Sequence, residues 1–528
     1  MKWMAGRNCG SRVERPSLAL RASVAVLGIS LLSGPGVWAA ENEAGRNLAA
    51  AMESITTPEL RRHVDVLASD AFEGRNAGSR GGRAASTYLV EQLRRYKLKP
   101  AGMDEGYYQS LDNGYRNVLA MIEGSDPKLK HEYIVVGAHY DHVGYGTSTT
   151  SFGPLGLVHH GADDNASGTA GLLEVAEALT RLEQPPRRSI LIAFWDGEEQ
   201  GLIGSEHFVQ HPTIPLANIK LMINLDMIGR LQNDTLTVFG TRTSAGLRRI
   251  VSESNQEAGL KLEFTREVKH NSDHHTFFTR GIPILMFHTG LHDDYHRPSD
   301  TVEKIDSAGI HKISQLLFRL VDHLGNAPEI APFRGASRRE AVTEEPGWVE
   351  VATPAGRLGI EWKTEGDAPQ GVEIASVVAG SPAALAGLKT DDRIVRCGEQ
   401  TIGSGRELRA AIVAAPRSVE LGVVRSGEKE PSGVKVELNG RPQRVGVSWW
   451  EDNAEPGALI VASVTPDSPA DRAGIRAGDR ILEFGGAAFK DGEEFRVKSA
   501  QLHGLTDLTI ERLGRLRPLQ VPLPKTPQ

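Results

Sequence analysis

The 528-residue sequence contains only two cysteines, Cys9 and Cys397. Small secreted domains that rely on a disulfide framework need several cysteine pairs, so this class of protein is excluded. Cys9 stands before the first apolar run, which is not the place of a lipoprotein cysteine. The stability of the mature chain therefore has to come from its hydrophobic core or from bound metal.

Positive charge is scarce relative to negative charge, with 60 Lys and Arg against 67 Asp and Glu and a net charge of −7. This balance argues against nucleic acid or an anionic membrane as the main partner. Long apolar runs are missing too, because residues 23–32 are too few to span a bilayer stably. Hydrophobic residues at 40% and charged residues at 24% are ordinary globular values.

The N-terminus has the pattern of an export signal. Basic residues precede the apolar run at 23–32, and Val37 and Ala39 occupy positions suited to −3 and −1 of a signal-peptidase site. We expect residues 1–39 to be a cleaved signal peptide and the protein to be secreted or periplasmic in a bacterium. The alternative is an uncleaved interfacial helix.

Strand-like and helical patterns alternate from about residue 48 to residue 325. The β-branched-rich runs are 133–139, 189–195, 219–227, 236–240 and 283–288, and the helical patterns between them are 169–182, 201–210 and 244–259. Such alternation predicts an α/β domain with a mixed, mostly parallel sheet and helices on both faces. In sheets of this kind a ligand binds beyond the carboxyl ends of the strands.

The C-terminal part has a different organisation. Residues 327–348 are rich in Pro, Ala and charge without periodicity, which predicts a linker. Beyond them RLGIEW is repeated as RVGVSW 87 residues later, and a Ser-Pro-Ala…Gly…Asp pattern repeats with the same offset. We therefore predict two small β-rich domains, at 349–438 and 439–525.

The ends of the predicted strands and the loops after them carry imidazole and carboxylate groups. No Ser or Cys nucleophile stands there, and each motif alone could be a helix cap or a buried polar group. Together, imidazoles and carboxylates suit zinc, and two zinc ions bridged by a carboxylate form a hydrolytic arrangement. The pattern does not choose between Asp163 and Asp164. The motifs are GAHYDHVG (137–144), GADDNASG (161–168), DGEEQG (196–201), NLDMIG (224–229) and YHRPSDT (295–301).

These five motifs, in this order, resemble those of the co-catalytic di-zinc aminopeptidases of peptidase clan MH. The resemblance runs from about residue 55 to 325 and implies the zinc-exopeptidase fold for residues 45–326, with two zinc ions per chain. It implies that one zinc is held by His139 and Asp226, that the other is held by Glu199 and His296, and that Asp164 bridges both.

The same resemblance implies roles for three further residues. Asp141 would accept the second N–H of His139 and fix its tautomer. Glu198 would be the general base, and Tyr295 would stabilise the oxyanion. Other histidines lack a motif position that would make them ligands, and among them His274 is expected nearest to the site; they are His142, His159, His160, His274, His275, His288 and His292.

The tandem repeats resemble PDZ domains, which bind the C-terminus of a peptide by strand addition. The carboxylate-binding loops would be Leu358, Gly359 and Ile360 in the first copy and Val445, Gly446 and Val447 in the second, although Asp391 replaces the usual glycine before Asp392. Peptide substrates and C-terminal peptide ligands are the partners that follow. The alternative is a pair of stability or assembly modules without peptide binding.

We predict an exported zinc exopeptidase, in first place an aminopeptidase that removes N-terminal residues through a metal-bridging water. A glutaminyl cyclase-like enzyme uses one zinc, and the presence of His139 and Asp226 speaks against it. A carboxypeptidase-type relative stays open because the sequence does not fix which end of the peptide binds. A PDZ-based binding protein with an inactive peptidase domain requires a lost ligand or base, and none is lost.

Overall fold

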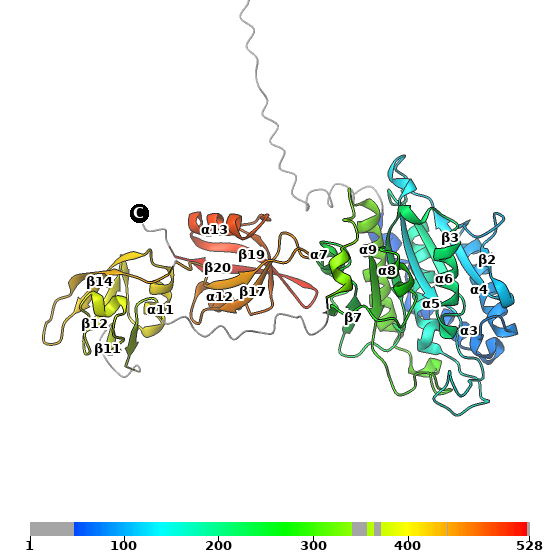
Figure 1. Cartoon of the computed structure of the whole chain (residues 1–528), viewed down its shortest axis with the longest axis horizontal. Helices are drawn as coiled ribbons and strands as arrows, with labels where there is room; N and C mark the ends of the chain where they lie inside the picture. The colour runs from blue at the N-terminus through cyan, green and yellow to red at the C-terminus, as the bar shows by residue number, and fades with distance from the viewer. Residues whose placement is uncertain (1–46, 341–355, 364–370, 441, 525–528) are drawn as a thin grey trace, which may run out of the picture.

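The computed structural model describes residues 47–340, 356–363, 371–440 and 442–524. They form an α/β domain and two small β-rich domains (Figure 1). The predicted signal peptide lies outside the described residues. Among the residues that are described, no helix combines the length and apolar character needed to cross a membrane.

The α/β domain is built on a nine-stranded sheet with the order β1-β3-β5-β4-β6-β9-β7-β8, and β2 pairs with β3. The central pairs β4–β5, β4–β6 and β6–β9 are parallel, whereas β3–β5 and β7–β9 are antiparallel. This confirms the predicted mixed, mostly parallel sheet. The strands are β1 Lys99–Pro100, β2 Tyr108–Ser110, β3 Arg116–Ile122, β4 Tyr133–His139, β5 Ser189–Trp195, β6 Ile219–Leu225, β7 Thr235–Phe239, β8 Lys261–Thr265 and β9 Ile284–His288.

Helices cover both faces of this sheet, as predicted (Figure 1). Every residue of β5 is buried because helices pack on both of its faces, which explains its uninterrupted apolar sequence. One face is covered by α2 Leu48–Glu53, α3 Thr57–Leu67, α4 Arg80–Arg95, α5 Gly168–Thr180, α7 Leu247–Ser254 and α9 Ser307–Asn326, and the other by α6 Ile203–Gln210 and α8 His274–Thr279.

The two small domains share one topology. The first has the strand order β10-β11-β12-β14-β15 and the second β16-β17-β18-β19-β20, each with its own hydrophobic core. The first contains β10 Ile360–Trp362, β11 Val372–Val377, α10 Pro382–Leu385, β12 Arg393–Cys397, β13 Gln400–Thr401, α11 Gly405–Ala414, β14 Ser418–Val424 and β15 Ser432–Glu437. The second contains β16 Val447–Trp450, β17 Leu459–Val464, α12 Pro469–Arg472, β18 Arg480–Phe484, α13 Gly492–Gln501, β19 Gly504–Arg512 and β20 Arg515–Leu523.

The first part of the predicted linker packs on the α/β domain. The Arg334 N–H donates to the Thr243 carbonyl at 2.7 Å, and the Ser244 hydroxyl donates to the Ala331 carbonyl at 2.6 Å. Phe333 meets Phe278 edge to face with ring centroids 5.6 Å apart, an apolar contact that the composition of this segment did not indicate. The segment up to Glu340 therefore belongs to the α/β domain, and residues 341–348 lie outside the described part of the chain.

The second small domain docks on the outermost strand of the large sheet. It lies between the first small domain and the α/β domain, beside α7 (Figure 1). The Leu262 N–H of β8 donates to the Leu513 carbonyl at 2.9 Å, and the Asn255 amide donates to the Gly514 carbonyl at 2.8 Å. The β19–β20 turn thus covers an edge that would otherwise present unpaired main-chain groups.

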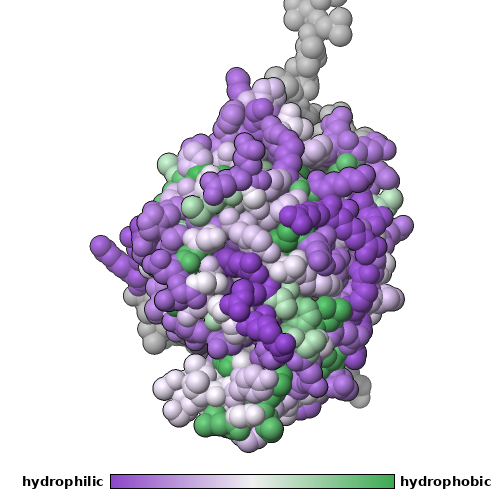
Figure 2. Space-filling view, turned by 90° about the vertical axis from the view of Figure 1, so that its right-hand side faces the viewer, coloured by the Kyte–Doolittle hydropathy of each residue, from purple (hydrophilic) through white to green (hydrophobic). Residues whose placement is uncertain are grey.

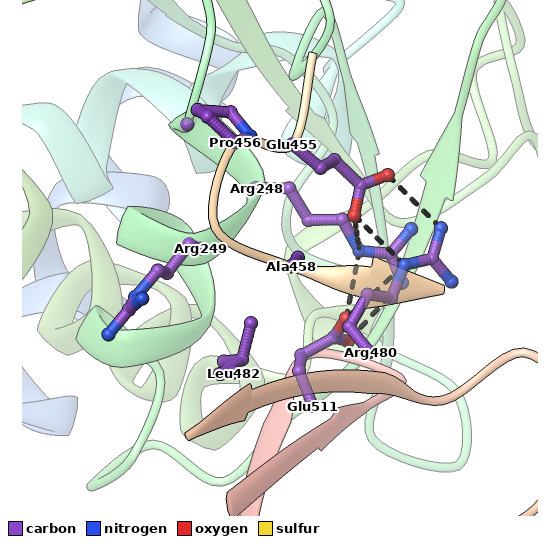
Figure 3. Close-up of a pocket in the computed structure, with 9 residues that line it drawn as sticks. Arg248, Arg249, Glu455, Pro456, Ala458, Arg480, Leu482 and Glu511 are labelled. Atoms are coloured by element: carbon purple, nitrogen blue, oxygen red, sulfur yellow. Dashed lines mark hydrogen bonds and ion pairs between the residues drawn. The ribbon is translucent and has the colours of Figure 1, made fainter. Parts of the chain in front are cut away.

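Largely buried ion pairs reinforce this contact (Figure 3). Arg248 of α7 lies 2.9 Å from Glu511, and Arg480 lies 2.9 Å from Glu455 beside it. Arg242 of the α/β domain lies 2.6 Å from Asp452. The Arg248–Glu511 and Arg242–Asp452 pairs cross between the two domains, whereas Arg480 and Glu455 both belong to the second small domain. Removing one member of a crossing pair would leave a largely buried charge without its partner.

We expect Gly514→Ala to separate the second small domain from the α/β domain. Gly514 has φ +74°, and a Cβ there would lie 2.3 Å from Cγ of Leu262. Gly474 provides a matched control, because its φ is +77° and nothing lies within 4 Å of its added Cβ. Both variants incur the backbone cost of about 1–2 kcal/mol, but only Gly514→Ala adds a clash at the docking surface. Small-angle scattering should show a larger radius of gyration for Gly514→Ala alone; identical curves for the two variants would contradict the docking.

Candidate metal centre

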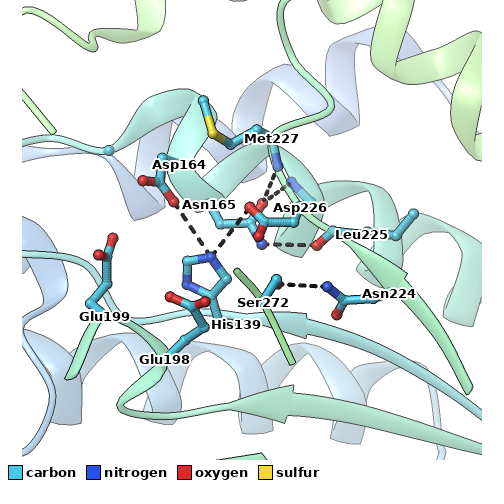
Figure 4. Close-up of polar contacts among 12 residues, drawn as sticks. His139, Asp164, Asn165, Glu198, Glu199, Asn224, Leu225, Asp226, Met227 and Ser272 are labelled. Atoms are coloured by element: carbon cyan, nitrogen blue, oxygen red, sulfur yellow. Dashed lines mark hydrogen bonds and ion pairs between the residues drawn. The ribbon is translucent and has the colours of Figure 1, made fainter. Parts of the chain in front are cut away.

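Three buried side chains meet where the parallel strands β4 and β6 end. His139 is the last residue of β4, Asp226 directly follows β6, and Asp164 lies in the π-helical segment Ala162–Ser167 that opens α5. Nε2 of His139 lies 3.4 Å from Oδ1 of Asp164 and 3.5 Å from Oδ1 of Asp226 (Figure 4). The three ligand-type atoms face a common point.

The spacing of these atoms fits zinc. Tetrahedral zinc with bonds of about 2.0–2.1 Å places its nitrogen and oxygen ligands about 3.3–3.4 Å from one another. The observed 3.4 and 3.5 Å agree with that spacing and exceed the usual range of a direct N–H···O hydrogen bond.

A second group of possible ligands shares Asp164 with the first. Nε2 of His296 lies 3.1 Å from Oδ2 of Asp164 and 3.0 Å from Oε2 of Glu199, and it is buried without a hydrogen bond to either. Asp164 therefore presents Oδ1 to one group and Oδ2 to the other. Such a carboxylate is placed to bridge two cations.

The neighbouring Asp163 faces away from both groups. Its Oδ1 accepts hydrogen bonds from the Gly229 N–H at 2.6 Å and the Ser167 hydroxyl at 2.9 Å, and Oδ2 lies 3.1 Å from Nε2 of His292. Of the two aspartates that the sequence pattern left open, the structure brings Asp164 to the site.

Asp141 holds a different partner from the one predicted. Nδ1 of His139 lies 3.2 Å from the main-chain oxygen of Asp141 and 3.8 Å from its carboxylate, so the carbonyl accepts the N–H and leaves Nε2 free for a metal. The carboxylate instead accepts the main-chain N–H of Glu198 at 3.1 Å. The expectation that the carboxylate fixes the tautomer is thus corrected: the carboxylate positions the segment that carries Glu198.

The two adjacent glutamates differ in their surroundings. Figure 4 shows Glu198 beside His139 and Glu199 on the side of Asp164. Burial raises the pKa of Glu198 well above its usual range, and the nearby Glu199 carboxylate adds to the effect. Although burial acts in the same direction on Glu199, His142 and His296 hold the pKa of Glu199 well below its usual range. A pair whose pKa values are pushed apart in this way suits one metal ligand and one proton acceptor.

Comparison with known proteins identifies the domains. Residues 117–321 match peptidase family M28, and residues 356–438 and 460–512 match PDZ domains. The chain contains a peptidase family M28 domain followed by two PDZ domains. The resemblance drawn from the five motifs and from the repeat is thereby confirmed.

Several relatives of the M28 domain are curated or solved. The chain is 27% identical over 306 residues to leupeptin-inactivating enzyme 1 of Streptomyces exfoliatus, covering 54% of this chain and 62% of that protein. It is 32% identical over 200 residues to aminopeptidase YwaD of Bacillus subtilis, covering 36% and 40%. The chain therefore spans less than two thirds of the length of either relative.

The chain is also similar to solved structures that are more distant in sequence. The LapA aminopeptidase of Legionella pneumophila is 20% identical with a TM-score of 0.44, over 55% of this chain and 76% of that chain. The glutaminyl cyclase of Porphyromonas gingivalis is 21% identical with a TM-score of 0.42, over 51% and 98%.

Other predicted residues of the M28 domain take the following places. The Tyr295 ring stacks on the His296 ring with centroids 3.9 Å apart, and burial raises the pKa of Tyr295 above its usual range. His274 is buried with neither ring nitrogen hydrogen-bonded, and burial lowers its pKa to about 3. His159 and His160 are held by the Ser151 hydroxyl and the Ala68 carbonyl, at 2.7 and 3.0 Å.

Sequence reasoning missed the place of His142. Its Nδ1 lies 2.7 Å from Oε1 of Glu199 and 3.7 Å from Oδ2 of Asp164, and its Nε2 is buried without a partner. His142 thus stands within reach of the second ligand group. The signal was present, because His142 belongs to the same GAHYDHVG motif as His139.

Arg75 is a second residue that the sequence did not single out. It is fully buried, and its guanidinium donates to main-chain oxygens only. Burial lowers its pKa to about 10, an effect opposed by the carboxylates of the site, Asp164 first among them. Arg75 therefore links the main-chain segments around both ligand groups and places a buried positive charge near their carboxylates. The acceptors are the carbonyls of Leu67, Tyr140, His160, Gly161 and Asp164.

Each predicted PDZ loop contains a glycine with a positive φ. Gly359 and Gly446 have φ +77° and +88°, and a Cβ on either would lie 2.3 or 2.1 Å from Cβ of Ser381 or Ser468. Leu358 and Val445 are buried before them, and Ile360 and Val447 begin β10 and β16. These strands are terminal in their sheets, so each has one edge without a strand partner among the described residues.

A tryptophan lies between strand and helix in each PDZ domain. Trp362 and Trp449 stand on β10 and β16, with the guanidinium carbons of Arg409 and Arg496 5.1 and 5.0 Å from the ring centroids. The first residues of α11 and α13 are glycines whose added Cβ would lie 2.3 and 2.5 Å from the indole nitrogen.

Proposed function

We propose that the M28 domain is a zinc aminopeptidase that binds two zinc ions per chain. The observation that supports this most directly is Asp164, whose two carboxylate oxygens face two separate ligand groups. His139 and Asp226 would complete one site, and Glu199 and His296 the other. The similarity to aminopeptidase YwaD over this domain supports peptides as substrates and their N-termini as the point of cleavage.

The residues around the metals would divide the chemistry between them. When bound, the two zinc ions activate water and polarise the scissile carbonyl. Glu198 is held beside His139 by the Asp141 carboxylate and would accept the proton of the attacking water, then return it to the leaving amine. The Tyr295 hydroxyl would donate to the oxygen that becomes negative in the transition state. His142 would orient Glu199 through the 2.7 Å contact.

We also propose that the protein is exported and that its PDZ domains bind C-terminal peptides. The basic and apolar segments before Ala39 support export. The single open edges of β10 and β16 and the left-handed glycines before them support strand addition at the two loops.

Metal removal tests the proposal for the M28 domain. Dialysis against a chelator should abolish hydrolysis of leucine nitroanilide, because the buried carboxylates of the site then lack their cations, and added zinc should restore it. Metal analysis of the restored protein should give two zinc ions per chain. Full activity with one tightly bound zinc would instead favour a glutaminyl cyclase-like site, and unchanged activity without metal would refute the metallopeptidase.

A further inference from the structure

The loop between β4 and the Asp164 segment exposes large hydrophobic side chains. Tyr145, Phe152, Leu155 and Leu157 are 49%, 62%, 53% and 53% exposed. In the end-on view of the M28 domain most of the surface is hydrophilic, and hydrophobic residues gather at its lower end (Figure 2). Such a concentration within one short segment is uncommon on a soluble protein without a binding role.

This loop is tied to the metal centre by its backbone. The Phe152 N–H donates to the His296 carbonyl at 3.1 Å, and Arg297 donates to the Phe152 carbonyl at 2.6 Å. Ser151 lies 2.7 Å from Nε2 of His159, which fixes the loop on its other side. Hydrogen bonds on both sides of Phe152 therefore hold its exposed side chain in place beside the site.

The Phe152 ring stands next to the groups that would act on substrate. Its centroid lies 6.1 Å from that of His296 and 6.0 Å from that of Tyr295. A substrate group held at His296 and Tyr295 thus has an aromatic face immediately beside it, with Leu155 and Leu157 farther along the loop.

We propose that Phe152, Leu155 and Leu157 form the subsite for the residue that follows the scissile bond, and that this subsite selects apolar side chains. The inference rests on the proposed aminopeptidase function. In an aminopeptidase only one residue precedes the cleaved bond, so the rest of the peptide must leave the site toward solvent. Phe152 is exposed beside His296 on a loop that also exposes Leu155 and Leu157, and it suits this leaving part of the chain.

Paired tripeptides test the subsite. Leu-Phe-Ala and Leu-Ser-Ala differ only in the residue after the scissile bond, so the ratio of their kcat/KM values reports contact at that residue alone. The wild-type protein should prefer Leu-Phe-Ala about tenfold. Phe152→Ala should lower kcat/KM for Leu-Phe-Ala about tenfold more than for Leu-Ser-Ala, and Phe152→Leu should retain part of the preference.

Met103→Ala serves as the control variant, because Met103 is also exposed in the M28 domain, at 49%, but lies outside this loop. It should leave both rates unchanged. A wild-type protein that cleaves both peptides equally, or a Phe152→Ala variant that slows both equally, would overturn the subsite while leaving the aminopeptidase intact. A wild-type protein that cleaves neither these peptides nor leucine nitroanilide would overturn both proposals.

Discussion

Glu198→Gln should keep the two proposed zinc ions and lose activity by several orders of magnitude. Glutamine preserves the size of the side chain and its hydrogen bonds but cannot accept the proton of the attacking water. The loss should exceed the roughly 10²–10⁴-fold often assigned to acid–base catalysis, because the same group would serve both proton transfers. Zinc should stay bound because Glu198 belongs to neither ligand group. Metal analysis and turnover of leucine nitroanilide measure the two quantities separately.

Glu199→Gln is the matched variant one residue away. Glu199 lies 3.0 Å from Nε2 of His296 and 2.7 Å from Nδ1 of His142, so the variant removes a negative charge from the second ligand group. Its zinc content should fall, and its activity should recover in part with excess zinc. If Glu198→Gln lost the metal and Glu199→Gln kept it, the roles within the pair would be the reverse of those proposed.

Arg75→Met should destabilise the M28 domain more than any surface substitution. It removes a donor from main-chain carbonyls at five positions, of which the Gly161 carbonyl keeps a second donor in the Ala166 N–H at 3.2 Å. Each buried carbonyl left unsatisfied costs about 1–3 kcal/mol. The sum is on the order of the whole stability of a domain, so little folded protein is expected. Thermal unfolding with and without added zinc measures the effect.

Arg75→Lys separates charge from geometry. Lysine keeps the positive charge but not the planar fork, so we expect a folded protein with a lower unfolding temperature and weaker zinc retention against a chelator. Arg80→Lys is the control, because Arg80 is an exposed residue whose change should leave the unfolding temperature and zinc retention close to those of the wild type. If the Arg75→Lys protein had the same unfolding temperature and zinc retention as wild type, the planar guanidinium of Arg75 would not be needed to position the segments that carry the proposed metal ligands.

The sequence predicted the parts of the site that depend on local pattern. His139 and Asp226 end or follow apolar strands, and parallel strands bring their carboxyl ends to one edge of the sheet, so the strand pattern places both at that edge. Their assignment to one zinc came from the resemblance. Arg75 escaped prediction because its partners are main-chain carbonyls, which no residue type marks in a sequence. The contact between His142 and Glu199 joins positions 57 residues apart, and the motif resemblance assigned no role to the second histidine.

The same limit applies to the arrangement of domains. The repeat offset and the separate cores were predictable, because each PDZ domain folds from a continuous stretch of sequence. The pairing of Arg248 with Glu511 joins residues 263 positions apart and has no local signature. Composition likewise predicted a linker from residue 327, where main-chain hydrogen bonds and the aromatic contact of Phe333 hold the chain to the M28 domain instead.

The position of the second PDZ domain also orders events during biosynthesis. Asn255 and Gly514, the turn glycine whose carbonyl accepts from the Asn255 amide, are 259 residues apart. At about 5–20 residues per second, the turn that covers the edge of β8 is therefore synthesised on the order of 10–50 s after Asn255. Once β9 and α9 have been made, β8 is the outermost strand of a sheet whose other strands are complete. Its unpaired amides and carbonyls are then open to strands of neighbouring nascent chains. The β19–β20 turn, which is made last, is therefore the segment that covers the edge of β8. Any chain that ends before this turn keeps an exposed strand edge that can pair with other chains.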